Sequence, residues 1–305
     1  MTTNQAIAGN RSLASVPHAP ESTAAFVSLL ASGVVWGLSW WPLKYFASLG
    51  FTGHTIGLTA YALVGAVSLP IIWRQRAQWA REWRLLLLIG LFFGCANMAF
   101  TAALTMGSVV RAMLLFFLLP AWGAIGGWLF LKERIGPRRL IAVALSLGGV
   151  FVIVDGVDAL RQHLSPADGM ALAAGFCYTA AGIANRKARA IPMASRTLVS
   201  FVGCTVVAVA ALGFTTPVFP DTSPFVWTML ALFAFLWLLG GTLLTTYGVT
   251  HVQASRAAVL QVVELVVAVF TAIWLGGEQL FLKDCIGGAM ILAATLIEAT
   301  SQPKE

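Results

Sequence analysis

One acidic side chain lies deep within a long apolar stretch of this chain. Glu264 is near the middle of residues 255–276 and follows Gln261 by three positions. An ionised carboxylate at the centre of a bilayer costs about 2.5–3.5 kcal/mol on insertion scales, so this position should face a protein interior or water. Glu264 could exchange protons with a pathway, bind an ammonium group, or stay protonated as a hydrogen-bonded structural acid. The sequence leaves these roles open.

Amide and hydroxyl side chains recur at four-residue spacing in two other apolar stretches, so each set shares one face of a helix. They are Asn97, Thr101 and Thr105 in the first stretch and Thr242 and Thr246 in the second. Such stripes can line a cavity. They can also hold helices together, because small and hydroxyl residues let membrane helices approach and hydrogen-bond. Both interpretations stay open here.

Two tryptophans lie one helical turn apart in the first apolar stretch. Trp36 and Trp40 are flanked by Gly33 and Gly37, which would let another helix approach closely. Flat rings around a cavity suit aromatic or long apolar ligands, because stacking adds about 0.5–1.5 kcal/mol beyond burial. Rings in the core or facing lipid would give the same pattern.

Three cations lie near the ends of apolar stretches. Lys44 is at the end of the first stretch, and Arg111 and Arg256 are at the starts of two later ones. Each could attract a carboxylate at the mouth of a pathway. Alternatively, each side chain reaches toward lipid headgroups.

Patterns typical of enzymes are missing from the sequence. HExxH, GxSxG and paired membrane aspartates do not occur, and the four histidines are far apart, at His18, His54, His163 and His251. We therefore predict no catalytic residue, metal site or cofactor. Without GxxxxGK[ST] there is no ATP site, so a gradient must supply any driving force. The cysteines are expected to be single packing residues rather than disulfides or ligands, at Cys95, Cys177, Cys204 and Cys285.

Ten apolar stretches fill the chain, most of them close to the ~20 residues that cross a hydrocarbon core as a helix. They cover residues 24–46, 53–73, 85–106, 109–131, 139–156, 167–185, 195–214, 224–249, 255–276 and 284–300. Fifteen of the nineteen Lys and Arg residues fall into alternate gaps between them. Because positive charge collects on the cytoplasmic side, we predict that both termini are cytoplasmic.

The composition is typical of an all-α integral membrane protein. Hydrophobic residues make up 59% and charged residues only 10%, which is more apolar surface than a soluble core can absorb. The net charge of +7 is loop charge beside lipid headgroups, and this excludes nucleic-acid binding. Little of the chain extends outside the bilayer, which disfavours a scaffold or receptor.

The ten stretches divide into two sets of five that match each other. An offset of 145 places Arg256 on Arg111, and an offset of 142 places Tyr178 on Trp36, so Tyr178 joins the cavity candidates. Because five is odd, a tandem copy enters the membrane from the opposite side, which predicts an inverted repeat. The predicted parts are a disordered cytoplasmic tail (1–23), the first repeat (24–156), a connecting loop (157–166), the inverted second repeat (167–300) and a cytoplasmic C-terminus (301–305).

The fourth and ninth stretches each end in a bulky apolar run followed by Glu, as Trp128–Glu133 and Trp274–Glu278. With the five-plus-five arrangement, the chain resembles the EamA branch of the drug/metabolite transporter superfamily over about residues 24–300. The opening Trp36–Pro42 is most similar to the YddG-type exporters of aromatic amino acids. The resemblance implies a cavity lined by the first, third, fourth, sixth, eighth and ninth stretches.

The ninth stretch departs from the family pattern. The family's proline is present in the fourth stretch as Pro120, but the aligned position of the ninth is Leu265, so the two halves need not flex alike. Glu133 and Glu278 lie at opposite faces in the inverted arrangement. We expect them to cap or pair locally, outside the site.

These observations and the resemblance predict a monomeric, multi-pass exporter of amino acids in the bacterial inner membrane. Its substrates would be aromatic and other bulky neutral amino acids, moved by alternating access. The alternative is a carrier of the same fold for another small metabolite or a drug-like compound. The expected partners are the small-molecule substrate and the lipid bilayer. Proton antiport and passive facilitation are both compatible with the sequence.

Overall fold

The protein is described by a computed structural model over residues 23–131, 136–154, 165–214, 216–252 and 254–301, and this part is helical without strands. Most of the predicted N-terminal tail and connecting loop, and Glu133, lie outside the described residues. The helices of the first half are α1 (Thr23–Gly37), α2 (Trp40–Ser48), α3 (Gly53–Arg74), α4 (Arg76–Trp79), the 3-10 turn η1 (Ala80–Glu82), α5 (Trp83–Met106), α6 (Val109–Phe116), α7 (Leu119–Leu131) and α8 (Pro137–Ile153). Those of the second half are α10 (Pro166–Lys187), α11 (Met193–Ala211), α12 (Pro224–Leu232), the π-helical η2 (Phe233–Leu239), α13 (Gly240–His251), α14 (Ala254–Trp274) and α15 (Leu282–Ser301).

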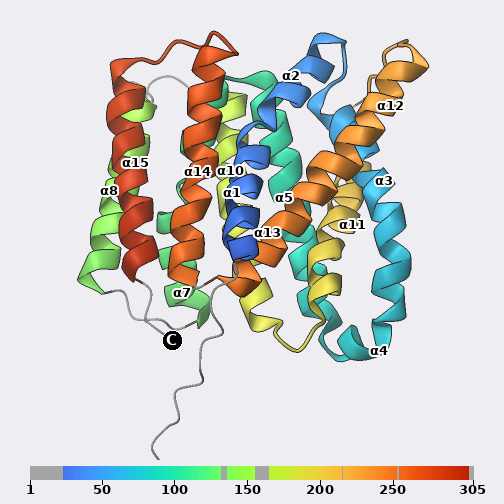
Figure 1. Ribbon diagram of the computed structural model, residues 1–305, viewed down its shortest axis with the longest axis horizontal. Helices are drawn as coiled ribbons and strands as arrows, with labels where there is room; N and C mark the ends of the chain where they lie inside the picture. The colour runs from blue at the N-terminus through green and yellow to red at the C-terminus, as the bar shows by residue number, and fades with distance from the viewer. Residues whose placement is uncertain (1–22, 132–135, 155–164, 215, 253, 302–305) are drawn as a thin grey trace, which may run out of the picture.

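The long helices stand side by side in one bundle (Figure 1). The beginning of α1 and the end of α15 lie at the lower end in this view. Helices α8 and α15 form one edge of the bundle, and α3 and α12 lie toward the other. Helix α5 lies at the centre, where it packs against α10 and α11.

Length and composition make this a multi-pass membrane protein. Six helical segments are long and apolar enough to cross a bilayer, and a shorter apolar helix covers Val259–Trp274. Large apolar side chains are exposed around the bundle, among them Leu236, Phe270 and Trp274. A soluble protein would not tolerate so much exposed apolar surface, whereas lipid solvates it. Helices lie over each of the ten predicted apolar stretches, but the count of ten crossings stays a prediction.

Within the described residues, three passages through the bundle depart from regular α-helix. The first breaks between α1 and α2, where Ser39 donates its N–H to Trp36 O instead of Val35 O. The fourth breaks between α6 and α7 next to Pro120, which has no N–H to donate. The eighth contains η2, and π-helical turns occur often at functional sites. Helix α14 is unbroken at Leu265, because this position has no proline to interrupt the helix.

Glycines bring two pairs of helices into backbone contact. A Cβ added to Gly203 of α11 would overlap Gly90 O of α5. Gly149 of α8 and Gly287 of α15 face each other in the same way, because a Cβ on either would lie 2.5–2.7 Å from the carbonyl oxygen of the other. Such close approach is a main source of helix association in membranes, where lipid removes the hydrophobic driving force.

Candidate functional site

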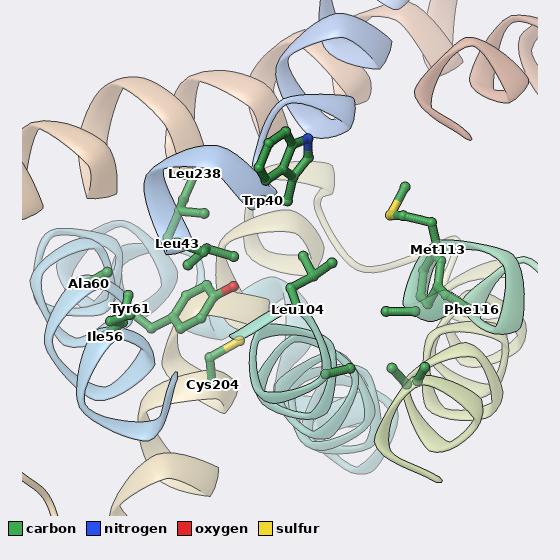
Figure 2. Close-up of a cluster of buried hydrophobic side chains, with 14 of the residues drawn as sticks. Trp40, Leu43, Ile56, Ala60, Tyr61, Leu104, Met113, Phe116, Cys204 and Leu238 are labelled. Atoms are coloured by element: carbon green, nitrogen blue, oxygen red, sulfur yellow. The ribbon is translucent and has the colours of Figure 1, made fainter. Parts of the chain in front are cut away.

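A small cavity lies among α1, α2, α3, α5 and η2. Its free space of about 20 Å³ has room for about one water molecule. The lining residues come from both halves of the chain: Trp36, Ser39, Leu43, Ile56, Gly57, Ala60, Tyr61, Asn97, Phe100, Thr101, Phe233 and Leu238. Figure 2 shows part of this wall, with the Tyr61 ring reaching from α3 toward Leu104 and its hydroxyl turned to the middle of the bundle.

The polar groups of the cavity meet at Tyr61. Its hydroxyl donates to Asn97 Oδ1 at 3.3 Å, and the Thr101 hydroxyl is also within hydrogen-bonding reach. Asn97 Nδ2 donates to Phe93 O at 2.8 Å, one helical turn earlier. A primary amide carries two N–H donors, so one N–H of Asn97 remains for a ligand.

The two predicted tryptophans use their indole N–H groups in parallel ways. Trp36 Nε1 donates to Thr245 Oγ1 of α13 at 3.0 Å, and Trp40 Nε1 donates to Thr271 Oγ1 of α14 at 3.0 Å. Trp36 is half-buried and lines the cavity, whereas Trp40 is only 4% exposed. Both hydrogen bonds tie the first passage to the second half of the chain.

A third indole supports the break between α1 and α2. Trp237 of η2 donates from Nε1 to Val35 O at 2.7 Å. That carbonyl has lost its helical donor, because Ser39 bonds to Trp36 O. A buried carbonyl without a partner costs about 1–3 kcal/mol, so the indole stabilises the break beside the cavity.

Aromatic rings lead from the cavity to Tyr178. Phe100 lines the cavity and lies 4.6 Å from Phe116, ring centre to ring centre. Phe116 and Phe93 each make an edge contact with Tyr178 at 5.5 Å. Tyr178 is nevertheless 37% exposed, so part of its ring faces open space.

The predicted acid lies near this tyrosine. The Glu264 carboxyl is half-buried and close enough to Tyr178 to interact with it electrostatically. It makes no hydrogen bond to any residue that the structure describes, and the same holds for half-buried Gln261 one turn before it. Gly33 and Gly37 let α1 approach the α14 backbone here, since a Cβ on Gly37 would lie 2.8 Å from Glu264 O.

The predicted cavity residues therefore separate into three groups. Trp36, Asn97 and Thr101 line the cavity, whereas Tyr178, with Glu264 near it, is connected to the cavity wall through Phe116. The others, Trp40, Thr105, Thr242, Thr246 and Gln261, are not part of this cavity wall in the described structure. Thr105 Oγ1 donates to Thr101 O and faces Gly53, and Thr242 Oγ1 donates to Leu238 O. The backbone carbonyl of half-buried Thr246 accepts from Thr250 Oγ1.

The three mouth candidates also lie apart from this cavity. Lys44 Nζ donates to Gly107 O at 2.7 Å, at the end of α5. Arg111 pairs with Asp168 at the start of α10, with 3.0 Å between Arg111 Nη2 and Asp168 Oδ2. Arg256 is exposed at the start of α14.

Several cavity residues were missing from the sequence-based prediction. The second passage, α3, contributes Tyr61 and three smaller residues, although it was not expected to line the cavity. A single tyrosine amid apolar residues is a weak signal in the sequence. It could still have indicated a polar contact, because a phenol inside a membrane helix needs a hydrogen-bond partner. Of the eighth-passage threonines, it is Thr245 that meets Trp36, rather than the predicted Thr242 or Thr246. All four cysteines are free, as expected, and the thiols of Cys95 and Cys177 lie close enough to interact electrostatically.

Comparison with known proteins fits this architecture. A curated protein of Archaeoglobus fulgidus, described as an uncharacterized transporter, is 25% identical over 222 residues, which are 70% of this chain and 76% of the relative. One solved crystal structure superposes with a TM-score of 0.56 at 16% identity, covering 92% of this chain and 98% of that chain, which shows the fold alone. The sequence profile of the EamA-like transporter family matches residues 23–155 and again residues 165–299. The chain thus consists of two repeats and belongs to the EamA-like transporter family, whose members are membrane transporters of the drug/metabolite type.

Proposed function

We propose that this transporter exports amino acids, mainly aromatic and other bulky neutral ones, across the bacterial inner membrane by alternating access. The observation that carries the proposal is the composition of the cavity wall. Rings of Trp36, Tyr61, Phe100 and Phe233 surround an amide and a hydroxyl, those of Asn97 and Thr101. Flat apolar walls with a few polar groups suit a ligand that has a polar end and a bulky apolar end.

The polar groups can take the two ends of an amino-acid backbone. The second N–H of Asn97 can donate to a carboxylate, and the Thr101 hydroxyl can accept from an ammonium group. The present space of about 20 Å³ is too small for an amino acid. The halves must therefore move apart for binding, and the observed geometry corresponds to a closed conformation.

The proposal includes a specific membrane arrangement. The ten apolar passages cross the bilayer, the two repeats run in opposite directions, and both termini are cytoplasmic. The transporter works as a monomer, because both sides of the cavity come from one chain. The similarity to YddG-type exporters belongs to this proposal as well.

A cationic metabolite or drug-like compound is the second candidate. Glu264 favours it, because this half-buried acid lies beside Tyr178 and bonds to no described residue. The cavity wall also contains no Lys or Arg among its lining residues. An organic cation would gain from an acid beside aromatic rings.

Counterflow into proteoliposomes distinguishes the two candidates. The purified protein is assayed with labelled aromatic, small and acidic amino acids and with an organic cation, each with and without a pH gradient. We expect accelerated exchange of phenylalanine and tryptophan over alanine and glutamate. Exchange of the cation alone would replace the first proposal by the second, and exchange of neither class would refute both.

A further inference from the structure

Three separate elements bind to one short segment, Gly107–Arg111, which comprises the connection between α5 and α6 and the first turn of α6. Lys44 of α2 donates to its first carbonyl at 2.7 Å. Asp168 of α10 forms an ion pair with its last residue at 3.0 Å. The third contact comes from Glu278, in the loop after α14. This end of the bundle is opposite to the end where α1 begins and α15 ends.

The Glu278 carboxylate makes three hydrogen bonds to the segment. Ser108 Oγ donates to it at 2.8 Å, and the backbone N–H groups of Val109 and Val110 donate at 2.8 and 3.0 Å. A carboxylate on the first amides of a helix is favoured by their partial positive charge, and charge-assisted bonds are stronger than neutral ones. The contact was expected to be local, but it joins residues 168–170 positions apart.

The bonds of Glu278 connect the two repeats. Helix α6 lies in the first matched segment, residues 23–155, and Glu278 lies in the second, residues 165–299. A carrier that opens one end at a time must separate its halves there. The three bonds of Glu278 join the two halves at this end, beside the Arg111–Asp168 ion pair that also joins them. If Glu278 moves away from α6 when this end opens, its three bonds have to break.

The local geometry allows these bonds to break at little cost. Ser108 Oγ also accepts from Arg111 N at 3.3 Å, so α6 keeps its own N-cap when Glu278 leaves. Ser108 is exposed, and water can replace the carboxylate. Glu278 follows Gly277, whose φ of +65° makes the turn that aims the side chain at α6.

We propose that Glu278 is a latch, a positioning residue whose carboxylate holds this end of the pathway closed between transport steps. In the proposed topology it is the outer end, and the inference rests on the alternating access of the proposed function. Glu278 contacts no cavity residue among its described hydrogen bonds, so it acts on the equilibrium between closed and open states.

The latch can be tested by a distance measurement at this end of the bundle. Spin labels are placed at Met106→Cys and Leu280→Cys, both exposed, after replacement of the four native cysteines. Glu278→Gln keeps the size of the side chain but removes its charge. We expect the ratio of long to short label distances to rise on the order of tenfold. Glu278→Asp keeps the charge and should give a smaller rise.

Asp221→Asn is the matched control, because Asp221 is an exposed acid in the loop before α12. It should leave the distances unchanged. An unchanged distribution in Glu278→Gln, or an equal shift in Asp221→Asn, overturns the latch. If Glu278→Gln does not fold, Ser108→Ala removes one of the three bonds and must still give a smaller shift in the same direction; no shift overturns the proposal.

This measurement is independent of the transported compound. If counterflow shows no exchange of amino acids, the proposed substrate is refuted, and the distance shift still tests the latch. A normal counterflow assay with no distance shift would refute the latch alone.

Discussion

Replacement of Trp36 tests the aromatic wall of the cavity. The ring lines the cavity, donates to Thr245 Oγ1 at 3.0 Å and rests against Gly241, where an added Cβ would lie 3.2 Å from the indole. Trp36→Ala removes the ring and leaves the polar groups of Asn97 and Thr101 in place. The lost stacking is about 0.5–1.5 kcal/mol, so affinity for aromatic substrates should fall about two- to tenfold more than affinity for small ones.

The assay is half-saturation of counterflow for phenylalanine, tryptophan and alanine in proteoliposomes. Trp36→Phe keeps a ring and should retain most of the preference for aromatic substrates. Trp40→Phe is the matched control, because Trp40 is buried and bonds to Thr271 outside this cavity. It should lower stability by about 1 kcal/mol through the lost hydrogen bond and leave selectivity unchanged.

Two results would refute this reasoning. The first is an equal loss of affinity for aromatic and small substrates in Trp36→Ala, which would mean that the ring only supports the fold. The second is a selectivity change in Trp40→Phe as large as that in Trp36→Ala, which would place the substrate elsewhere.

Three further predictions concern charge, packing and topology. Glu264 makes no hydrogen bond to a described residue, so it is available to exchange protons with the pathway. We expect Glu264→Gln to lower flux driven by a pH gradient and to leave gradient-free counterflow intact. Loss of both fluxes would instead indicate contact with a substrate ammonium group, and two unchanged fluxes would mean that Glu264 has a structural role. Mild oxidation should join Cys95 of α5 to Cys177 of α10, because their thiols lie close enough to interact, and mass spectrometry that finds only free thiols would contradict this packing. In intact cells, an external impermeant thiol reagent should label a cysteine introduced at Asp221 but not one introduced at Gln78, Gly136 or Ala190, which we predict to be cytoplasmic. Labelling at any of these three positions would disprove the topology.

The helical class and the family could be predicted from the sequence because they depend on signals that extend over the whole chain. Long apolar stretches leave few alternatives to membrane helices. The repeated Glu after a bulky apolar run recurs once in each half, and the family profile matches each half separately. Glu278 could be predicted as a cap from its position, but its partner on α6 could not, because the contact is distant in the sequence.

The cavity could be predicted only in part, because periodicity gives the face of a helix and not its neighbour. Asn97 and Thr101 share a face that meets α3, and both line the cavity. Thr105 lies one turn further on the same face, yet there α5 packs against Gly53 and leaves no space. Tyr61 was missed because it is a single tyrosine within the second stretch, and its role depends on packing against α5.

Labelling of Thr101→Cys tests most directly whether the cavity between the two halves is the transport pathway. Thr101 lines the cavity and is only 4% exposed, so it should react only when the protein opens. A small impermeant thiol reagent should modify it from each side of the membrane, and saturating phenylalanine should slow the reaction several-fold. Val206→Cys, on the exposed face of α11, should show no protection by substrate. No reaction at Thr101→Cys from either side, or no effect of any transported compound on its rate, would contradict the account.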